Sequence, residues 1–154
     1  MTDPVFGKKE AALNYKERDG VYAIVPDASG KRIMTLAAPN GAVFLPGGGV
    51  EAGETDAETL NRELLEEFGV AVKIDGKLGR AAEYFYSHHR QTAYYHPATF
   101  YATSELKVAA DPLEDFNVLM MMPISIALAQ LKRPTHRYAL SEWIKYHNGQ
   151  RELD

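Results

Sequence analysis

The sequence predicts an α/β (α+β) fold, built as an α/β/α sandwich in which helices cover both faces of a mixed β-sheet. Three observations support this prediction. Segments rich in β-branched and aromatic residues lie before one central amphipathic helix, similar segments follow it, and the C-terminal part contains two further helix patterns. Strands on both sides of a helix favour a mixed sheet, and helices in different parts of the chain can cover its two faces.

The first half of the chain predicts short strands separated by turns. Residues 20–25 are β-branched and aromatic, and the turn-forming residues 26–30 follow them. Residues 32–36 return from that turn, which predicts a β-hairpin with the first strand. Residues 42–45 form a third short strand that runs into a proline and three glycines. After the central helix, further strands are predicted at residues 70–74, 80–86 and 99–103.

The central helix has recognisable signals at both ends. Thr55 or Asp56 can cap its start, and Gly69 can end it. Its apolar residues recur with a period near 3.6, which indicates one buried stripe. The residues of this stripe are Ala57, Leu60, Leu64 and Phe68.

The C-terminal part predicts two more helices, at residues 124–131 and 135–147. The second of these carries Tyr138, Trp143 and Ile144 as candidates for packing. The chain has 154 residues and shows no internal repeat and no linker-like segment. It therefore suits a single domain spanning residues 1–154.

The composition argues against several kinds of function. A formal net charge of -4 provides no positive field that would attract nucleic acid or an acidic membrane, so neither partner is expected. The absence of cysteine excludes disulfides, thiolate catalysis and Cys-ligated zinc, and it fits a cytoplasmic location. The first residues lack the pattern of a signal peptide, and the apolar stretch 116–131 is too short to span a bilayer comfortably.

Three acidic residues of the central helix share one face. Glu63, Glu66 and Glu67 are spaced i, i+3 and i, i+4, so their side chains are neighbours, at the edge of the buried side of the helix. Like charges at this spacing destabilise a helix, and carboxylate oxygens are suitable ligands for hard cations such as Mg²⁺ or Mn²⁺. The alternative interpretation is a solvated acidic face with Arg62 as the partner of Glu66, and the three acids alone do not decide between the two.

The surrounding residues favour the metal site. Three glycines precede the helix directly after a strand, and glycines let backbone groups approach a ligand. From Gly48 to Val70 the chain reads glycine, five residues, glutamate, seven residues, arginine-glutamate, an aliphatic residue, any residue, two glutamates, any residue, glycine and an aliphatic residue. This segment resembles the Nudix box at every required position. A chance match in a chain of this length is on the order of one in ten million.

The resemblance implies a Nudix-type fold and the hydrolysis of a nucleoside diphosphate linked to another moiety. Divalent metals, with Mg²⁺ favoured and Mn²⁺ as the alternative, neutralise the phosphates in this reaction and lower the pKa of a water. The residues that match the family's metal-binding positions are Glu63, Glu66 and Glu67, together with Gly48, which would offer its backbone carbonyl.

The same resemblance assigns further catalytic roles. Arg62 and Glu54 match a pair that orients the acids through a charged hydrogen bond. Glu63 is our choice for the general base, with Glu67 beside it in the catalytic group. In some family members the base lies in a loop after the box, which makes Glu114 the alternative. Many relatives carry a further acid near position 117, where this chain has Asn117.

Substrate contacts are expected from the segment after the box, whose residues 82–95 resemble those of MutT-type bacterial Nudix proteins. His88 and Arg90 could contact phosphates or a base, and Tyr86 could stack on a nucleobase. The alternatives are a polar hairpin tip and a packed strand face.

The expected partner is a small-molecule nucleotide. Nucleoside triphosphates, including oxidised ones, are favoured, followed by dinucleoside polyphosphates and then nucleotide sugars. A catalytically weak nucleotide-binding or regulatory protein is the alternative, but such proteins typically lose box acids and this chain has all of them. The sequence predicts no oligomeric state.

Overall fold

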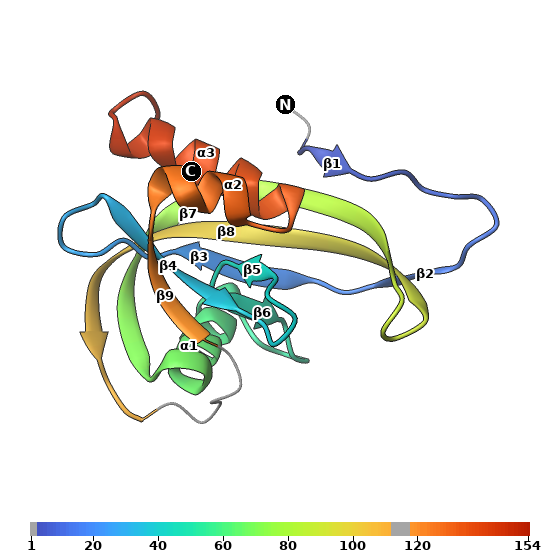
Figure 1. The fold of residues 1–154 in the computed structure, drawn as a ribbon, viewed down its shortest axis with the longest axis horizontal. Coiled ribbons are helices and arrows are strands. Elements are labelled where there is room, and N and C mark those ends of the chain that lie inside the picture. The colour runs from blue at the N-terminus through green and yellow to red at the C-terminus, as the bar shows by residue number, and fades with distance from the viewer. Residues whose placement is uncertain (1–2, 112–117) are drawn as a thin grey trace.

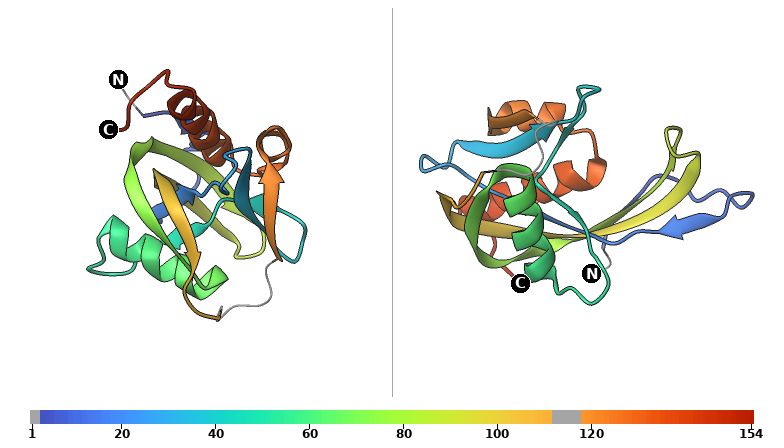
Figure 2. Two further views of the ribbon diagram at one scale, coloured as in Figure 1. Left: turned by 90° about the vertical axis from the view of Figure 1, so that its left-hand side faces the viewer. Right: turned by 90° about the horizontal axis from the view of Figure 1, so that it is seen from below.

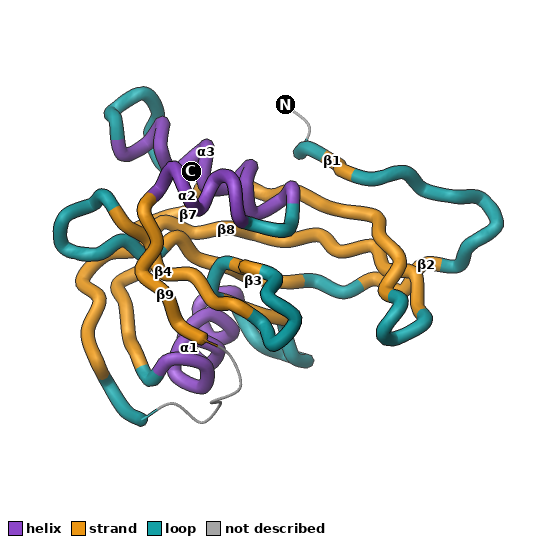
Figure 3. The backbone as a smooth tube through the Cα atoms, in the orientation of Figure 1, coloured by secondary structure: helices purple, strands orange, loops and turns teal. Residues whose placement is uncertain are grey.

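The computed structural model describes residues 3–111 and 118–154. Its strands and helices follow one another along the chain as Figures 1 and 3 show. They are β1 (Val5–Phe6), β2 (Tyr15–Glu17), β3 (Gly20–Ile24), β4 (Arg32–Ala37), β5 (Val43–Phe44), β6 (Gly47–Gly49), α1 (Asp56–Phe68), β7 (Val70–Ser87), β8 (Thr92–Val108), β9 (Val118–Pro123), α2 (Ile124–Gln130) and α3 (Pro134–His147).

The strands form two sheets. The larger, six-stranded sheet is mixed and has the order β1-β7-β8-β3-β6, with β2 also paired to β8. Parallel pairs join β1 to β7 and both β2 and β3 to β8, whereas β7 with β8 and β3 with β6 are antiparallel. The smaller sheet is antiparallel in the order β5-β4-β9.

The helices cover the sheets from opposite sides, which confirms the predicted fold class (Figure 1). β3 alternates between two buried clusters, as a strand with both faces covered must. Val21 and Ala23 belong to the cluster that includes Leu60 and Leu64 of α1. Ile24 belongs to the cluster that includes Ala127 of α2 and, from α3, Ala139, Leu140 and Trp143.

The predicted hairpin between residues 20–25 and 32–36 is wrong beyond its first residues. Near the turn, Met34 N donates to Val25 O at 2.8 Å and Asp27 N donates to Arg32 O at 3.0 Å. The two strands then separate into different sheets, because β3 pairs with β8 and β6 whereas β4 pairs with β9 and β5. Strands that are distant in the sequence, β8 and β9, thus take the place of the predicted pairing between β3 and β4.

The two strands predicted at residues 70–74 and 80–86 are parts of one long strand, β7. It pairs with β8 from Val70 opposite Val108 to Ser87 opposite Thr92, and the register shifts near Gly76 and Gly79. These glycines mark irregularities within the strand rather than its ends. The turn after Ser87 lies far from the helices, alongside the N-terminal segment that carries β2 (Figure 2, right).

The predicted helices are present, with one correction to the buried stripe of α1. Leu60, Leu64 and Phe68 are buried, but Ala57 is exposed and Thr59 is buried instead. Ala57 lies in the first turn, where the helix has only begun to pack. None of the helices within residues 3–111 and 118–154 has the length and apolar character needed to cross a membrane.

Candidate active site

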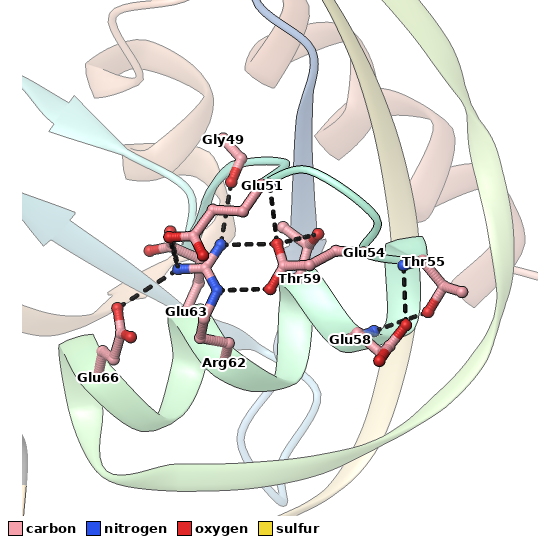
Figure 4. Close-up of polar contacts among 9 residues, drawn as sticks. All are labelled: Gly49, Glu51, Glu54, Thr55, Glu58, Thr59, Arg62, Glu63 and Glu66. Carbon is pink, nitrogen blue, oxygen red and sulfur yellow. Dashed lines mark hydrogen bonds and ion pairs between the residues drawn. The ribbon is translucent and has the colours of Figure 1, made fainter.

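α1 presents the acidic residues because both of its ends are fixed. The Thr55 side chain accepts a hydrogen bond from Glu58 N at 3.2 Å, and Glu58 Oε1 accepts one from Thr55 N at 3.0 Å, which forms a capping box (Figure 4). Gly69 ends the helix with φ 65° and ψ 32°, a left-handed conformation that glycine adopts without steric cost. With Leu60 and Leu64 in the core, Glu63 and Glu67 lie next to β6.

Two carboxylates, one helical turn apart, lie against the glycine strand β6. The Glu63 carboxylate occupies the space beside Gly48, where an added Cβ would lie 2.5 Å from Glu63 Cδ and 2.6 Å from Oε1. Gly47 N donates to Glu67 Oε1 at 3.3 Å. β6 therefore brings its backbone close to both acids, and only the missing side chain at Gly48 makes room for Glu63.

Arg62 is the centre of the charged contacts (Figure 4). Its Nε donates to Glu54 Oε2 at 2.7 Å and its Nη2 donates to Glu54 Oε1 at 2.9 Å, a two-pronged pair that fixes the guanidinium plane. Nη2 also donates to Gly49 O at 3.1 Å, which links the helix to β6. Nη1 lies 2.9 Å from Glu63 Oε1 and 3.5 Å from Glu66 Oε2.

These contacts shift the protonation equilibria of the central pair. Hydrogen bonds from Arg62, and after them from Glu51 N, lower the pKa of Glu54 to about 2. The hydrogen bond with Glu54 raises the pKa of Arg62 above its already high ordinary value. Both groups are therefore charged at every physiological pH, and the pair that the sequence predicts is present as an ion pair.

The residues fit a divalent cation, although the acids do not form a closed cluster. Among the described residues, no three His, Cys, Asp or Glu side chains converge tightly enough to hold a metal ion as they stand. The Arg62 guanidinium supplies the positive charge between Glu63 and Glu66 instead. The hard oxygen donors of the carboxylate that packs against Gly48 match the preference of Mg²⁺. The groups that could hold it are the Gly48 backbone, Glu63, Glu66 and Glu67.

Two hollows meet at β6. The first, which we call the acidic groove, has a volume of about 580 Å³ and is lined by Glu17, Arg18, Asp19, residues 49–54 and Glu63. The second, which we call the aromatic pocket, has a volume of about 270 Å³. It is lined by Arg18, Tyr22, Phe44, Gly48, Gly49, Phe85, Ser87, Arg90, Tyr94, His96, Arg133 and His136. Arg18 and Gly49 line both hollows.

Neutral polar groups form one wall of the aromatic pocket. His96 Nδ1 lies 2.6 Å from Arg18 O, and because a carbonyl can only accept, Nδ1 carries the proton. His96 Nε2 is then the acceptor for the Tyr22 hydroxyl at 3.3 Å. Burial lowers the pKa of His96 and raises that of Tyr22 to about 12, so both are uncharged at neutral pH.

His136 completes this wall as a fixed neutral ring. Leu45 N donates to His136 Nδ1 at 3.1 Å, so this nitrogen carries no proton. Burial holds the pKa of His136 well below its usual value. The sequence predicts a solvated helix junction around Pro134 that includes His136, but the structure corrects this, because His136 is 1% exposed. Neither His136 nor Tyr22 lies in a recognisable motif, so the sequence assigns them no functional role.

The predicted substrate-binding residues are divided by the structure. Arg90 lines the aromatic pocket, whereas Tyr86 and His88 are not among its lining residues. Tyr86 is 42% exposed, and its ring meets that of His88 edge-on at 5.0 Å between centroids. The alternative base Glu114 and the amide Asn117 lie outside the described residues.

The fold and the arrangement around α1 define a Nudix-type hydrolase. The family model of the NUDIX domain matches residues 16–144, and the chain belongs to the Nudix family. It is a Nudix-type pyrophosphohydrolase, an enzyme acting on acid anhydrides. No curated protein matches the chain by sequence.

Solved structures share the fold along most of the chain. The E. coli ORF135 protein is 18% identical with a TM-score of 0.67, over 91% of this chain and 96% of that one. A MutT Nudix hydrolase from Burkholderia pseudomallei is 24% identical with a TM-score of 0.59, over 82% of this chain and 98% of that one. A Nudix hydrolase from Nitrosomonas europaea is 18% identical with a TM-score of 0.63, over 90% and 93%. At these identities the similarity shows the fold.

Proposed function

We propose that this Nudix hydrolase uses Mg²⁺, or Mn²⁺ in its place, to cleave a phosphoanhydride bond in a nucleoside diphosphate linked to another moiety. Nucleoside triphosphates, including oxidised ones, are the favoured substrates, ahead of dinucleoside polyphosphates and nucleotide sugars. The observation that carries the proposal is the placement of Glu63 and Glu67 against β6, one turn apart and beside Arg62.

In this proposal the Gly48 carbonyl, Glu63, Glu66 and Glu67 hold the metal. When bound, the metal supplies positive charge against the diphosphate and activates water. The oxygens of Glu63 and Glu67 are already held near the glycine backbone, so little reorganisation is needed. Glu66 is more exposed, with 35% of its side chain accessible, and completes the set from the open side.

Arg62 and Glu54 position the acids. The two-pronged bond to Glu54 and the bond to Gly49 O leave Nη1 of Arg62 directed at Glu63, 2.9 Å away. Glu63 is thereby held in one rotamer and is our choice for the base that takes the proton from the attacking water. Glu114 remains the alternative base.

The setting of the reaction is also a proposal. Five acidic side chains line the groove together with Arg18, so a polyanion such as nucleic acid would be repelled, whereas a small nucleotide needs only the metal and a few cations. We therefore propose a small-molecule nucleotide as the partner. A cytoplasmic location and a single domain over residues 1–154 stay predictions.

The test is a nucleotide panel assayed with Mg²⁺, with Mn²⁺ and with excess chelator. We expect turnover that requires the cation, and a fall in kcat by at least about 10² in Glu63→Gln and in Glu67→Gln, the size of losing a base or a metal ligand. Glu58→Gln is the control, because glutamine can still accept from Thr55 N in the capping box. Full turnover in chelator, or an equal loss in Glu58→Gln, contradicts the proposal.

Isotope labelling tests the bond that breaks. Hydrolysis in ¹⁸O-labelled water is expected to place the label on a phosphate product, because the acids direct the water at phosphorus. Label on a sugar carbon would contradict the mechanism.

A further inference from the structure

The aromatic pocket differs from the acidic groove in the sign of its charge. Its described lining contains three arginines and two histidines and no acidic side chain. Both histidines are neutral, because burial lowers the pKa of His96 and of His136. The charge of the pocket therefore comes from its arginines.

Of the three arginines, Arg133 is the one that forms an ion pair with another of the described residues. Arg133 Nη1 lies 3.6 Å from the half-buried Glu83, and its guanidinium stacks 3.9 Å above the centre of the Phe85 ring. Within residues 3–111 and 118–154, no ion pair involves Arg18 or Arg90. In the aromatic pocket both cations face a described lining without a carboxylate, and Arg18 also borders the acidic groove.

Arg18 is placed at the boundary between the two hollows. Its backbone is fixed by β8, because Arg18 N donates to Tyr95 O at 2.9 Å and Arg18 O accepts from His96 Nδ1 at 2.6 Å. Its guanidinium lies over β6, since a Cβ added at Gly49 would be 3.4 Å from Arg18 Nε. Because Arg18 lines both hollows, a phosphate chain that spans the acidic groove and the aromatic pocket would lie within reach of this side chain.

Arg90 stands near the turn of the β7–β8 hairpin. Its backbone N donates to Ser87 Oγ at 3.2 Å, which holds the turn. The interaction of its side chain with the hydroxyl of Tyr94 is the main cause that lowers the pKa of Tyr94. Arg90 is exposed and also lines the aromatic pocket, so its guanidinium lies at the rim of this pocket.

We propose that Arg18 and Arg90 form a second anion site in the aromatic pocket, which binds a phosphate of the substrate beyond those held at the acidic groove. This inference rests on the proposed function and narrows its substrate class. The proposed substrate class is a nucleotide that carries a phosphate in addition to its diphosphate. This phosphate is either the third or a later one in a polyphosphate chain, or a phosphate ester elsewhere on the molecule. Substrates in which a neutral sugar is attached to the diphosphate are disfavoured, because they offer no negatively charged group to the two arginines.

The experiment measures binding without metal, so that it does not depend on hydrolysis. Inorganic tripolyphosphate and adenosine 3′,5′-bisphosphate are titrated into the full chain in excess chelator by calorimetry. We expect both Arg18→Gln and Arg90→Gln to weaken binding by about tenfold, the scale of one charge-assisted hydrogen bond. Arg18 is exposed, so its substitution leaves the core unchanged, and thermal unfolding of each variant checks this.

The control is Arg32→Gln. Arg32 is an exposed arginine of β4 that lines neither hollow, and its loss changes the net charge by the same amount. If Arg18→Gln weakens the binding of tripolyphosphate more than that of the bisphosphate, the site binds a phosphate chain. If it weakens the binding of the bisphosphate more, the site binds a phosphate ester. Absence of binding, or equal weakening in Arg32→Gln, overturns the proposal.

Steady-state kinetics separate this inference from the proposed function. With the substrate that the panel identifies, Arg18→Gln is expected to raise KM about tenfold with kcat nearly unchanged. Glu63→Gln is expected to lower kcat instead. A loss of kcat without a change in KM in Arg18→Gln contradicts the second anion site and leaves the proposed hydrolysis standing.

Discussion

The carboxylate of Glu63 fills the space that a side chain at Gly48 would need. An added Cβ would approach Glu63 Cδ to 2.5 Å, well inside van der Waals contact. Glu63 cannot retreat freely, because Arg62 Nη1 holds Oε1 at 2.9 Å and is itself anchored on Glu54. The run of glycines before the helix thus serves a steric purpose at this residue.

Gly48→Ala is therefore expected to displace Glu63 and lower kcat by at least about 10², comparable to losing the carboxylate itself. Gly48 does not have a positive φ, so the backbone can accept alanine without conformational strain. The neighbouring Gly49→Ala provides the comparison, because its Cβ would meet the flexible Arg18 side chain at 3.4 Å and the Asp19 backbone oxygen at 3.9 Å, an ordinary contact distance. Kinetics that show the larger loss in Gly49→Ala would contradict the placement of Glu63.

The Arg62–Glu54 pair predicts a particular dependence of stability on pH. The pKa of Glu54 is about 2 in the folded protein and 4.5 without its partners, with the hydrogen bond from Arg62 as the main cause. A carboxylate with a lowered folded pKa stabilises the protein above its unfolded pKa, and this stability is lost as the pH falls through the folded value.

The difference in Tm between the wild type and Glu54→Gln is therefore expected to be constant from pH 8 to about 5 and to shrink between about 4.5 and 2. Thermal unfolding across this range measures it. A difference that grows on acidification would show that the pair does not hold Glu54 in its charged form.

Much of α1 and its acids could be predicted from the sequence, because the determinants are local. Thr55 and Gly69 carry the capping chemistry in their own side chains and backbone, and the i, i+4 spacing of Glu63 and Glu67 fixes their common face without reference to the rest of the chain. The Nudix box covers the same residues, so the family motif and the helix signals predict the same segment.

The features that could not be predicted depend on distant partners. The sequence predicts that β4 pairs with the nearest strand, β3, but β4 pairs with β9, about 85 residues away. The residues of β4 themselves contain no signal that identifies this distant partner. Arg18 lies in a polar segment with no motif, and it gains its place only because Tyr95 and His96 of β8 bind its backbone. The aromatic pocket is likewise assembled from four separate parts of the chain, within residues 18–22, 44–49, 85–96 and 133–136.

The capping box predicts a change in stability that leaves the chemistry intact. Thr55→Ala removes the oxygen that accepts from Glu58 N and is expected to lower the free energy of unfolding by about 1 kcal/mol. Because the acids proposed to bind the metal are about two to three turns further along the helix, kcat is expected to stay close to that of the wild type. Urea denaturation and a standard assay measure the two effects, and a large loss of kcat would mean that the helix start controls the site.

Mg²⁺ is expected to stabilise the folded protein even without substrate. Arg62 brings positive charge close to both Glu63 and Glu66, at 2.9 and 3.5 Å. One guanidinium facing several carboxylates leaves net negative charge, which a divalent cation reduces in the folded state and not in the unfolded chain. At about ten times its Kd, the added stability is about 1.4 kcal/mol, which corresponds to a few degrees in Tm.

The same measurement locates the ion. Glu63→Gln and Glu67→Gln are each expected to reduce the Mg²⁺-induced rise in Tm, because each removes a charge from the set that faces β6. Glu58→Gln keeps its capping bond at the other end of the helix and is expected to retain the full rise. The comparison is made at constant ionic strength, so that screening of the many surface charges does not imitate binding. Equal rises in all three variants would place the ion elsewhere on the protein, and the assignment of Glu63 and Glu67 as its ligands would be wrong.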